Sequence, residues 1–120
     1  MYYTKHVTLT DTTETPLFTV PDGYHANITF VFAANHSGTP GNVTVKWTDD
    51  AGTPNDLMYI FDTVQVAANN NITLGGQSQA PIFVLHEGEV VRAQAGQVGD
   101  IEVAVTFNLE ENAPALVNFV

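Results

Sequence analysis

The stretch Thr19–Asn35, TVPDGYHANITFVFAAN, decides the fold class, because it contains a long and regular alternation of side chains. From Tyr24 onward the alternation has a period of two over eleven residues, which is typical of an extended strand with one dry and one wetter face. We expect the dry face to be formed by Tyr24, Ala26, Ile28, Phe30, Phe32 and Ala34. The other face is expected to carry His25, Asn27, Thr29, Val31 and Ala33.

Turn sequences bound this strand on both sides. Pro21–Gly23 (PDG) precedes it, and a turn is predicted there because Pro fixes its own φ and Gly accepts a positive φ. Asn35–Gly38 (NHSG) follows and ends the alternation. The remaining chain is therefore interpreted as further strands that cover the dry face.

The rest of the sequence reads as short strands separated by Gly, Pro and Asn turns, without a helical period. The last strand is the most regular of them, with Ile101, Val103, Val105, Phe107 and Leu109 predicted to face inward. The other strands are predicted over Lys5–Asp11, Pro16–Val20, Asn42–Asp49, Leu57–Phe61 (as a buried strand, continued over Thr63–Ala67 after a bend at Asp62), Ile72–Leu74, Pro81–Leu85 and Glu89–Ala95.

This pattern predicts an all-β protein, a single antiparallel β-sandwich of jelly-roll type with about eight or nine strands. A length of 120 residues fits one domain, and a hydrophobic fraction of 44% argues against disorder. Within residues 1–120 we expect an N-terminal arm over residues 1–6 and a C-terminal tail over residues 111–120.

The charge balance restricts the partners of the protein. Thirteen acidic residues against three basic ones give a formal net charge of −10, and the cations Lys5, Lys46 and Arg92 are far apart in the sequence. Nucleic acids and anionic membranes are bound through clustered Lys and Arg, so neither partner is expected. The sequence has no Cys, and its N-terminus lacks the apolar core of a secretion signal, which favours synthesis in a cytoplasm.

No arrangement of residues predicts a cofactor or a catalytic site. His6, His25, His36 and His86 lack the spacing of metal ligands, and His86–Glu89 is better interpreted as a hairpin turn. The acidic loop Asp49–Asp56 offers oxygen ligands for Ca²⁺, but it does not follow the EF-hand pattern, and a solvated loop is the favoured interpretation. Because nucleophile and phosphate-binding motifs are also missing, we expect a protein that is not an enzyme.

Trp47 is the one tryptophan, and it falls on the predicted inward face of its strand. A role in filling the core is favoured over a role as a platform for sugar rings, because aromatic side chains at such positions are usually buried.

Three segments resemble small virion proteins of tailed bacteriophages. They are Val7–Asn35 (VTLTDTTETPLFTVPDGYHANITFVFAAN), Val84–Gly96 (VLHEGEVVRAQAG) and Glu102–Asn112 (EVAVTFNLEEN), so the resemblance covers most of the chain. The shared features are turns and core positions, and they include no catalytic residues. The resemblance implies a capsid decoration, collar or tail-accessory subunit, often oligomeric.

The function expected from this resemblance is that of a non-enzymatic capsid decoration protein, located in the virion and bound to the major capsid protein. A tail, collar or fibre adaptor, or a receptor- or carbohydrate-binding module that uses an exposed Tyr or Trp with the Asp49–Asp56 loop, remains the alternative. Both chain ends carry apolar residues that need cover. The predicted partner-binding residues are Tyr2, Tyr3, Lys5, Leu116, Val117 and Phe119.

Overall fold

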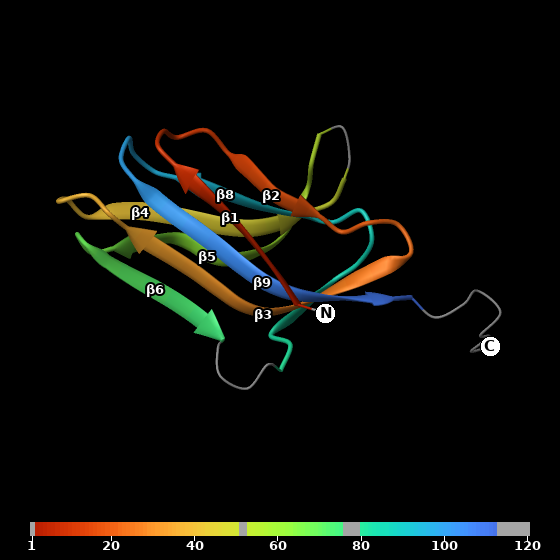
Figure 1. The fold of residues 1–120 in the computed structure, drawn as a ribbon. Helices are drawn as coiled ribbons and strands as arrows, with labels where there is room; N and C mark the ends of the chain where they lie inside the picture. The colour runs from red at the N-terminus through yellow and green to blue at the C-terminus, as the bar shows by residue number, and fades with distance from the viewer. Residues whose placement is uncertain (1, 51–52, 76–79, 113–120) are drawn as a thin grey trace.

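Two antiparallel sheets pack face to face in the computed structural model, which describes residues 2–50, 53–75 and 80–112 (Figure 1). The first sheet has the strand order β1-β9-β3-β6, and β7 also pairs with β3; the second sheet has the order β2-β8-β4-β5. The strands are β1 (Tyr2–Leu9), β2 (Thr15–Thr19), β3 (Tyr24–Asn35), β4 (Gly41–Thr48), β5 (Asp56–Val66), β6 (Asn70–Gly75), β7 (Phe83–Leu85), β8 (Val90–Ala95) and β9 (Ile101–Glu111).

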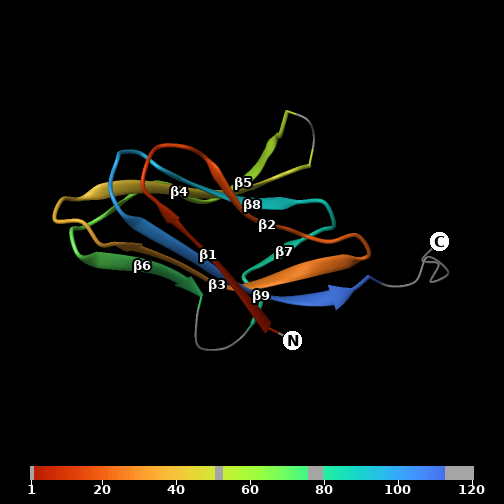
Figure 2. The ribbon, with the colours of Figure 1, turned by 45° about the horizontal axis from the view of Figure 1, so that its top comes forward.

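The strand pairs are nested in the way that defines a jelly roll. β1 pairs with β9, β2 with β8, β3 with β6 and β7, and β4 with β5. β6 and β7 lie one after the other along the same edge of β3, opposite residues 30–35 and 26–28 respectively. The two sheets are seen edge-on in Figure 2. The predicted β-sandwich of jelly-roll type is therefore confirmed.

The core lies between the sheets and consists of aliphatic side chains with few aromatic rings. The alternation predicted for β9 is confirmed, because Ile101, Val103, Val105 and Phe107 are at most 3% exposed. Phe107 stacks on Phe18 of β2 with a ring separation of 4.1 Å, and this contact joins the two sheets.

The facing predicted for the second half of β3 is wrong. Its pairing with β9 shifts register between Ile28 and Phe30, which marks a β-bulge at this point. A bulge adds one residue to the strand, so every later side chain changes face. Val31 and Ala33 are fully buried in the core, where Phe30 and Phe32 were expected. Phe30 and Phe32 instead lie half-buried on the outer face of the sheet.

The segment Leu57–Phe61, expected to be a buried strand, forms part of the edge strand β5. Leu57, Met58 and Tyr59 are between 40% and 47% exposed, whereas Phe61 is buried in the core and Ile60 packs against it. The predicted continuation past Asp62 is confirmed, because β5 runs on to Val66 through an irregularity in its pairing with β4.

Asn35 is a polar side chain that is buried at the end of β3, where it is 2% exposed. Its amide nitrogen donates hydrogen bonds to the carbonyl oxygens of Thr39 (2.8 Å) and Val66 (3.2 Å). Its amide oxygen accepts bonds from the main-chain N–H of Ser37 (2.9 Å) and from the Ser37 hydroxyl (2.8 Å). These four bonds fix the loop between β3 and β4 to the end of β5.

Two predicted turns are confirmed, and they lie side by side at one end of the sandwich. The Pro21–Gly23 turn has Gly23 at φ 83°, and the His86–Glu89 turn has Gly88 at φ 81°. The Gly23 N–H donates to the Glu87 carboxylate at 2.7 Å and so joins the two turns.

Candidate binding surfaces

A charged cluster lies on the outer face of the second sheet. Lys46 of β4 is paired with Asp56 at 2.8 Å and with Glu14 at 3.2 Å. Arg92 of β8 stands opposite Lys46 in the strand register, and its Nε lies 3.8 Å from Glu14. The Arg92 Nε also donates to the hydroxyl of Thr48 at 3.0 Å. Two of the three basic residues of the chain are thus close together in space, and both are engaged by carboxylates.

Hydrogen bonding within this cluster changes the acidity of its members. The bond to Asp56 raises the pKa of Lys46 above its ordinary value, against a smaller opposing effect of burial. The bonds from Lys46 and Tyr59 lower the pKa of Asp56, and the carboxylate of Asp56 raises the pKa of the Tyr59 hydroxyl. The Tyr59 hydroxyl donates to Asp56 at 3.0 Å, and Lys46 Nζ lies 5.5 Å from the centre of the Tyr59 ring.

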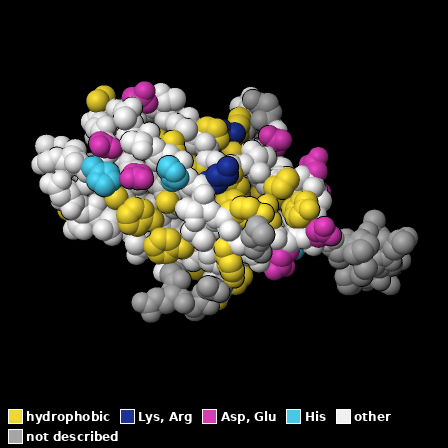
Figure 3. Space-filling view, in the orientation of Figure 1, with side chains coloured by type: hydrophobic (Ala, Val, Ile, Leu, Met, Phe, Trp, Pro, Cys, Tyr) yellow, Lys and Arg dark blue, Asp and Glu magenta, His cyan; other side chains and the backbone are white. Residues whose placement is uncertain are grey.

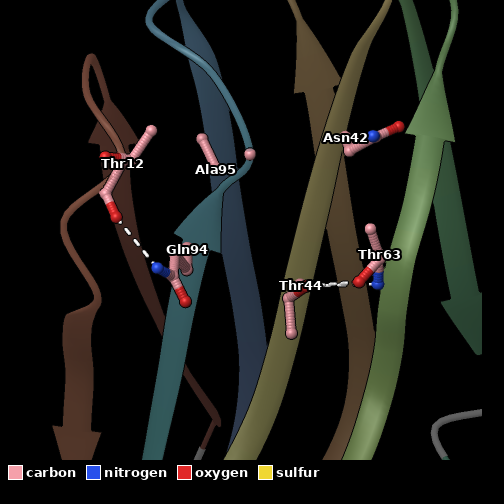
Figure 4. Close-up of a pocket in the computed structure, with 7 residues that line it drawn as sticks. Thr12, Asn42, Thr44, Thr63, Gln94 and Ala95 are labelled. Carbon is pink, nitrogen blue, oxygen red and sulfur yellow. Dashed lines mark hydrogen bonds between the residues drawn. The ribbon is translucent and has the colours of Figure 1, made fainter.

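A pocket of about 260 Å³ opens on the same face, at the neighbouring outward positions of the strands (Figure 4). Its lining is uncharged and comes from four separate segments of the chain: Thr12, Asn42, Thr44, Thr63, Gln94, Ala95 and Gly96. The Gln94 amide donates to the carbonyl oxygen of Thr12 at 2.9 Å, and the Thr44 hydroxyl accepts the main-chain N–H of Thr63 at 3.1 Å. We call this the polar pocket.

Thr63 gives the polar pocket an unusual backbone geometry. It has φ 52°, in the left-handed region, which a β-branched residue rarely adopts. It sits where the pairing of β5 with β4 becomes irregular, and such bulges often redirect a side chain beside a functional site. Backbone strain of this kind persists only where the surrounding structure enforces it.

The predicted partner-binding residues of the N-terminus lie in β1, at the edge of the first sheet. Tyr2, Tyr3 and Lys5 stand opposite Asn108, Phe107 and Val105 of β9 in the strand register. Tyr2 and Tyr3 are 47% and 43% exposed, and the ring of Tyr3 stacks on Phe107 with centroids 5.7 Å apart. The other predicted contact residues, Leu116, Val117 and Phe119, lie outside the described residues.

Sequence reasoning missed an aromatic surface beside these residues. Phe30 and Phe32 stack on each other with centroids 6.4 Å apart, on the same outer face as Tyr2. We call Tyr2, Phe30 and Phe32 the aromatic face. Figure 3, which has the orientation of Figure 1, shows hydrophobic side chains gathered over β3. Small side chains of β9, Ala104 and Thr106, lie between β1 and the two phenylalanines.

Two of the histidines and Asp49 of the acidic loop make contacts within the protein. His25 lies 3.3 Å from Glu110, and His36 lies 3.1 Å from Glu102. One oxygen of the Asp49 carboxylate accepts the N–H of Asn55 at 2.9 Å. Within residues 2–50, 53–75 and 80–112, three or more His, Asp or Glu side chains never come together in a way that could hold a metal ion. The same residues contain no helix long and apolar enough to cross a membrane.

Trp47 faces inward, as predicted. It is partly buried against the core and meets the ring of Phe83 edge-on, with centroids 5.1 Å apart. It is therefore part of the packing between the sheets, and Tyr59 is the exposed aromatic residue on the outer face of the second sheet.

The residues of the polar pocket were not predicted as a site. The only available signal was the outward alternation of Thr44 and Lys46 in β4, which predicts a polar face but not a pocket. Thr12, Thr63 and Gln94 come from other segments, and only the strand order places them beside Thr44.

Comparison with known proteins shows similarity at the level of the fold. Neither a protein-family model nor a curated protein matches the sequence. A solved chain from Bacillus endospore appendages, described as disulfide-linked pili, is similar with a TM-score of 0.51 and 13% identity, covering 93% of this chain and 89% of the other. A chain from the capsid asymmetric unit of cyanophage Pam1 has a TM-score of 0.50 and 20% identity, covering 88% of this chain and 83% of the other. The chain thus shares its β-sandwich fold with a pilus chain and with a phage capsid chain.

Proposed function

We propose that this protein is a non-enzymatic structural subunit of a phage particle, and that it decorates the outer surface of the major capsid shell. The aromatic face carries the proposal, because two stacked and half-buried phenylalanines on the outside of a sheet form an apolar surface suited to contact with another protein. The neighbouring Thr4 and Thr106 hydroxyls, 3.0 Å apart, can add neutral hydrogen bonds to such a contact.

The size of the fold is consistent with an accessory subunit. The similarity to the Pam1 chain covers 88% of this chain and 83% of the other, so a chain of about this length occurs in that capsid asymmetric unit. Disulfide linkage, described for the Bacillus pili, has no counterpart here because the sequence has no Cys. Assembly would therefore depend on non-covalent contacts.

Among the described residues, no strand pairs with the outer edge of β1, which adjoins the aromatic face at Tyr2 and extends the proposed contact. β1 is the last strand of its sheet and is eight residues long, so its outer N–H and C=O groups are a template for pairing with a neighbouring chain. Tyr2 and Tyr3 lie at the start of this strand, and both are well exposed. We propose that β1 and the aromatic face together contact the capsid or a second copy of the chain.

The number of copies per purified particle, measured by mass spectrometry against the major capsid protein, tests this role. Hundreds of copies support decoration of the shell. A dozen or fewer would assign the protein to a collar, tail or fibre adaptor and overturn decoration. Absence from particles would overturn the virion role altogether.

A pair of exposed tyrosines on opposite sheets gives a matched test of the contact surface. Tyr2→Ser removes one ring of the aromatic face, whereas Tyr59→Ser removes a ring of similar exposure from the second sheet. We expect Tyr2→Ser, and more strongly Phe32→Thr, to lower the occupancy of particles while Tyr59→Ser does not. Each variant is checked for an unchanged circular dichroism spectrum. Equal occupancy of folded Phe32→Thr and wild type would refute the assigned surface.

A further inference from the structure

The proposed virion role does not use the polar pocket, which lies on the sheet opposite the aromatic face. We propose that it binds a neutral sugar ring, such as the terminal residue of a surface glycan. This inference is independent of where, or whether, the protein sits on a particle.

The chemistry of the lining selects the class of ligand. Amide and hydroxyl groups each donate and accept hydrogen bonds, which matches the adjacent hydroxyl groups of a sugar. Among the described residues, the carboxamide of Asn42 and the hydroxyl of Thr12 have no hydrogen-bond partner, so both are free to bind a ligand. Gln94 uses its amide nitrogen on Thr12, which leaves its amide oxygen oriented as an acceptor.

The lining argues against charged and apolar ligands. It contains no carboxylate and no cation, since the nearby Lys46 and Arg92 are held by Glu14 and Asp56. Its one buried apolar side chain is Ala95, which is too small to anchor a lipid or a hydrophobic peptide. The volume of about 260 Å³ is just below the roughly 300–1,000 Å³ of sites for drug-sized ligands, which suits a single ring.

The strained residue provides a second, independent observation. Thr63 lines the pocket at φ 52°, and its main-chain N–H and its hydroxyl both approach the Thr44 hydroxyl, at 3.1 and 3.4 Å. The bond from the Thr63 N–H holds the Thr44 hydroxyl in a fixed position before a ligand arrives. Fixed positions reduce the entropy that binding must remove, which is how a small open pocket gains useful affinity.

The experiment is a titration of the ¹⁵N-labelled full chain with glucose, galactose, mannose and N-acetylglucosamine, followed by amide chemical shifts. We expect at least one neutral sugar to bind saturably with a Kd of about 1 mM. The shifts should be confined to the amides of the polar pocket. Glycerol, as a small polyol without a ring, should give only linear, unsaturated shifts.

Two variants test whether the polar pocket binds the sugar. Asn42→Ala removes a carboxamide that makes no bond within the described structure, so it should fold normally and bind about five-fold more weakly. Thr73→Val, an exposed threonine on the first sheet, is the matched control and should bind as wild type. Absence of saturable shifts at the pocket, or unchanged affinity in Asn42→Ala, would overturn the proposal. Stronger binding of glucuronate than of neutral sugars would overturn the assigned ligand class.

Discussion

Replacing Thr63 by Gly is expected to stabilise the protein, although it removes a side chain. Thr63 has φ 52°, where the Cβ of an L-residue crowds the following carbonyl oxygen, and Gly has no Cβ. Asn69 has almost the same φ, 54°, but Asn tolerates this region well. The two residues form a natural comparison, because the same substitution relieves strain at one position and not at the other.

The expected magnitude follows from two opposing terms. Relief of the left-handed conformation is worth about 1–2 kcal/mol, and the greater freedom of Gly in the unfolded chain costs about 0.5–1 kcal/mol. The hydroxyl contacts that are lost, at 3.4 Å to Thr44 and 3.3 Å to Asp62, are long and exposed and contribute little. Thr63→Gly should therefore gain about 0.5–1 kcal/mol, whereas Asn69→Gly should lose about 0.5 kcal/mol.

The assay is urea denaturation followed by the fluorescence of Trp47, with thermal unfolding as a second measurement. A gain of this size corresponds to a rise in Tm of about 2–5 °C for a domain of this length. Thr63→Ala serves as a further control, because it removes the hydroxyl and the branch but keeps the Cβ; we expect little stabilisation from it. A folded Thr63→Gly variant that is less stable than both wild type and Thr63→Ala would refute the strain argument.

Three other changes have expected outcomes. Asn35→Ala should lower the free energy of unfolding by about 3 kcal/mol in urea denaturation, because the four hydrogen bonds of a buried side chain are lost. A loss below that of an ordinary surface substitution would contradict the role of this side chain. Gly75→Ala should lower the free energy of unfolding by more than about 2 kcal/mol, because Gly75 has φ 83° and a Cβ there would collide with a carbonyl oxygen of β3. The control Gly38→Ala, at a position with open space, should lower it only slightly. Equal Tm values for the two variants would disprove the clash. Because the pKa of Asp56 is lowered in the folded protein, its pairing with Lys46 stabilises the protein at pH values above the ordinary carboxyl pKa, and this stabilisation is lost as the pH falls through the folded-state pKa. Wild type should therefore lose more stability than Asp56→Asn between pH 7 and pH 3. Parallel losses in the two proteins would exclude this contribution.

The sequence by itself determined the fold class and the strands whose two faces differ in polarity. In β9 the inward aliphatic residues alternate with polar or small ones, so the buried side is unambiguous, and the prediction held. The turns around Gly23 and Gly88 were likewise predicted from local chemistry, because the positive φ of Gly is a property of the residue itself. The inward direction of Trp47 followed from the same alternation.

Only the tertiary structure decided the facing of the second half of β3 and the exposure of β5. From Phe30 to Ala33 both sides of the strand are apolar, so alternation cannot distinguish them, and pairing through a bulge selects Val31 and Ala33 for the core. The run Leu57–Phe61 reads as buried, but it lies at an edge, and edge position depends on strand order. The polar pocket has the same origin, because its lining comes from four segments that meet only when the sheet forms. A local pattern shows that side chains alternate along a regular stretch, whereas bulges, register and neighbouring strands decide which of them share a face and which face is covered.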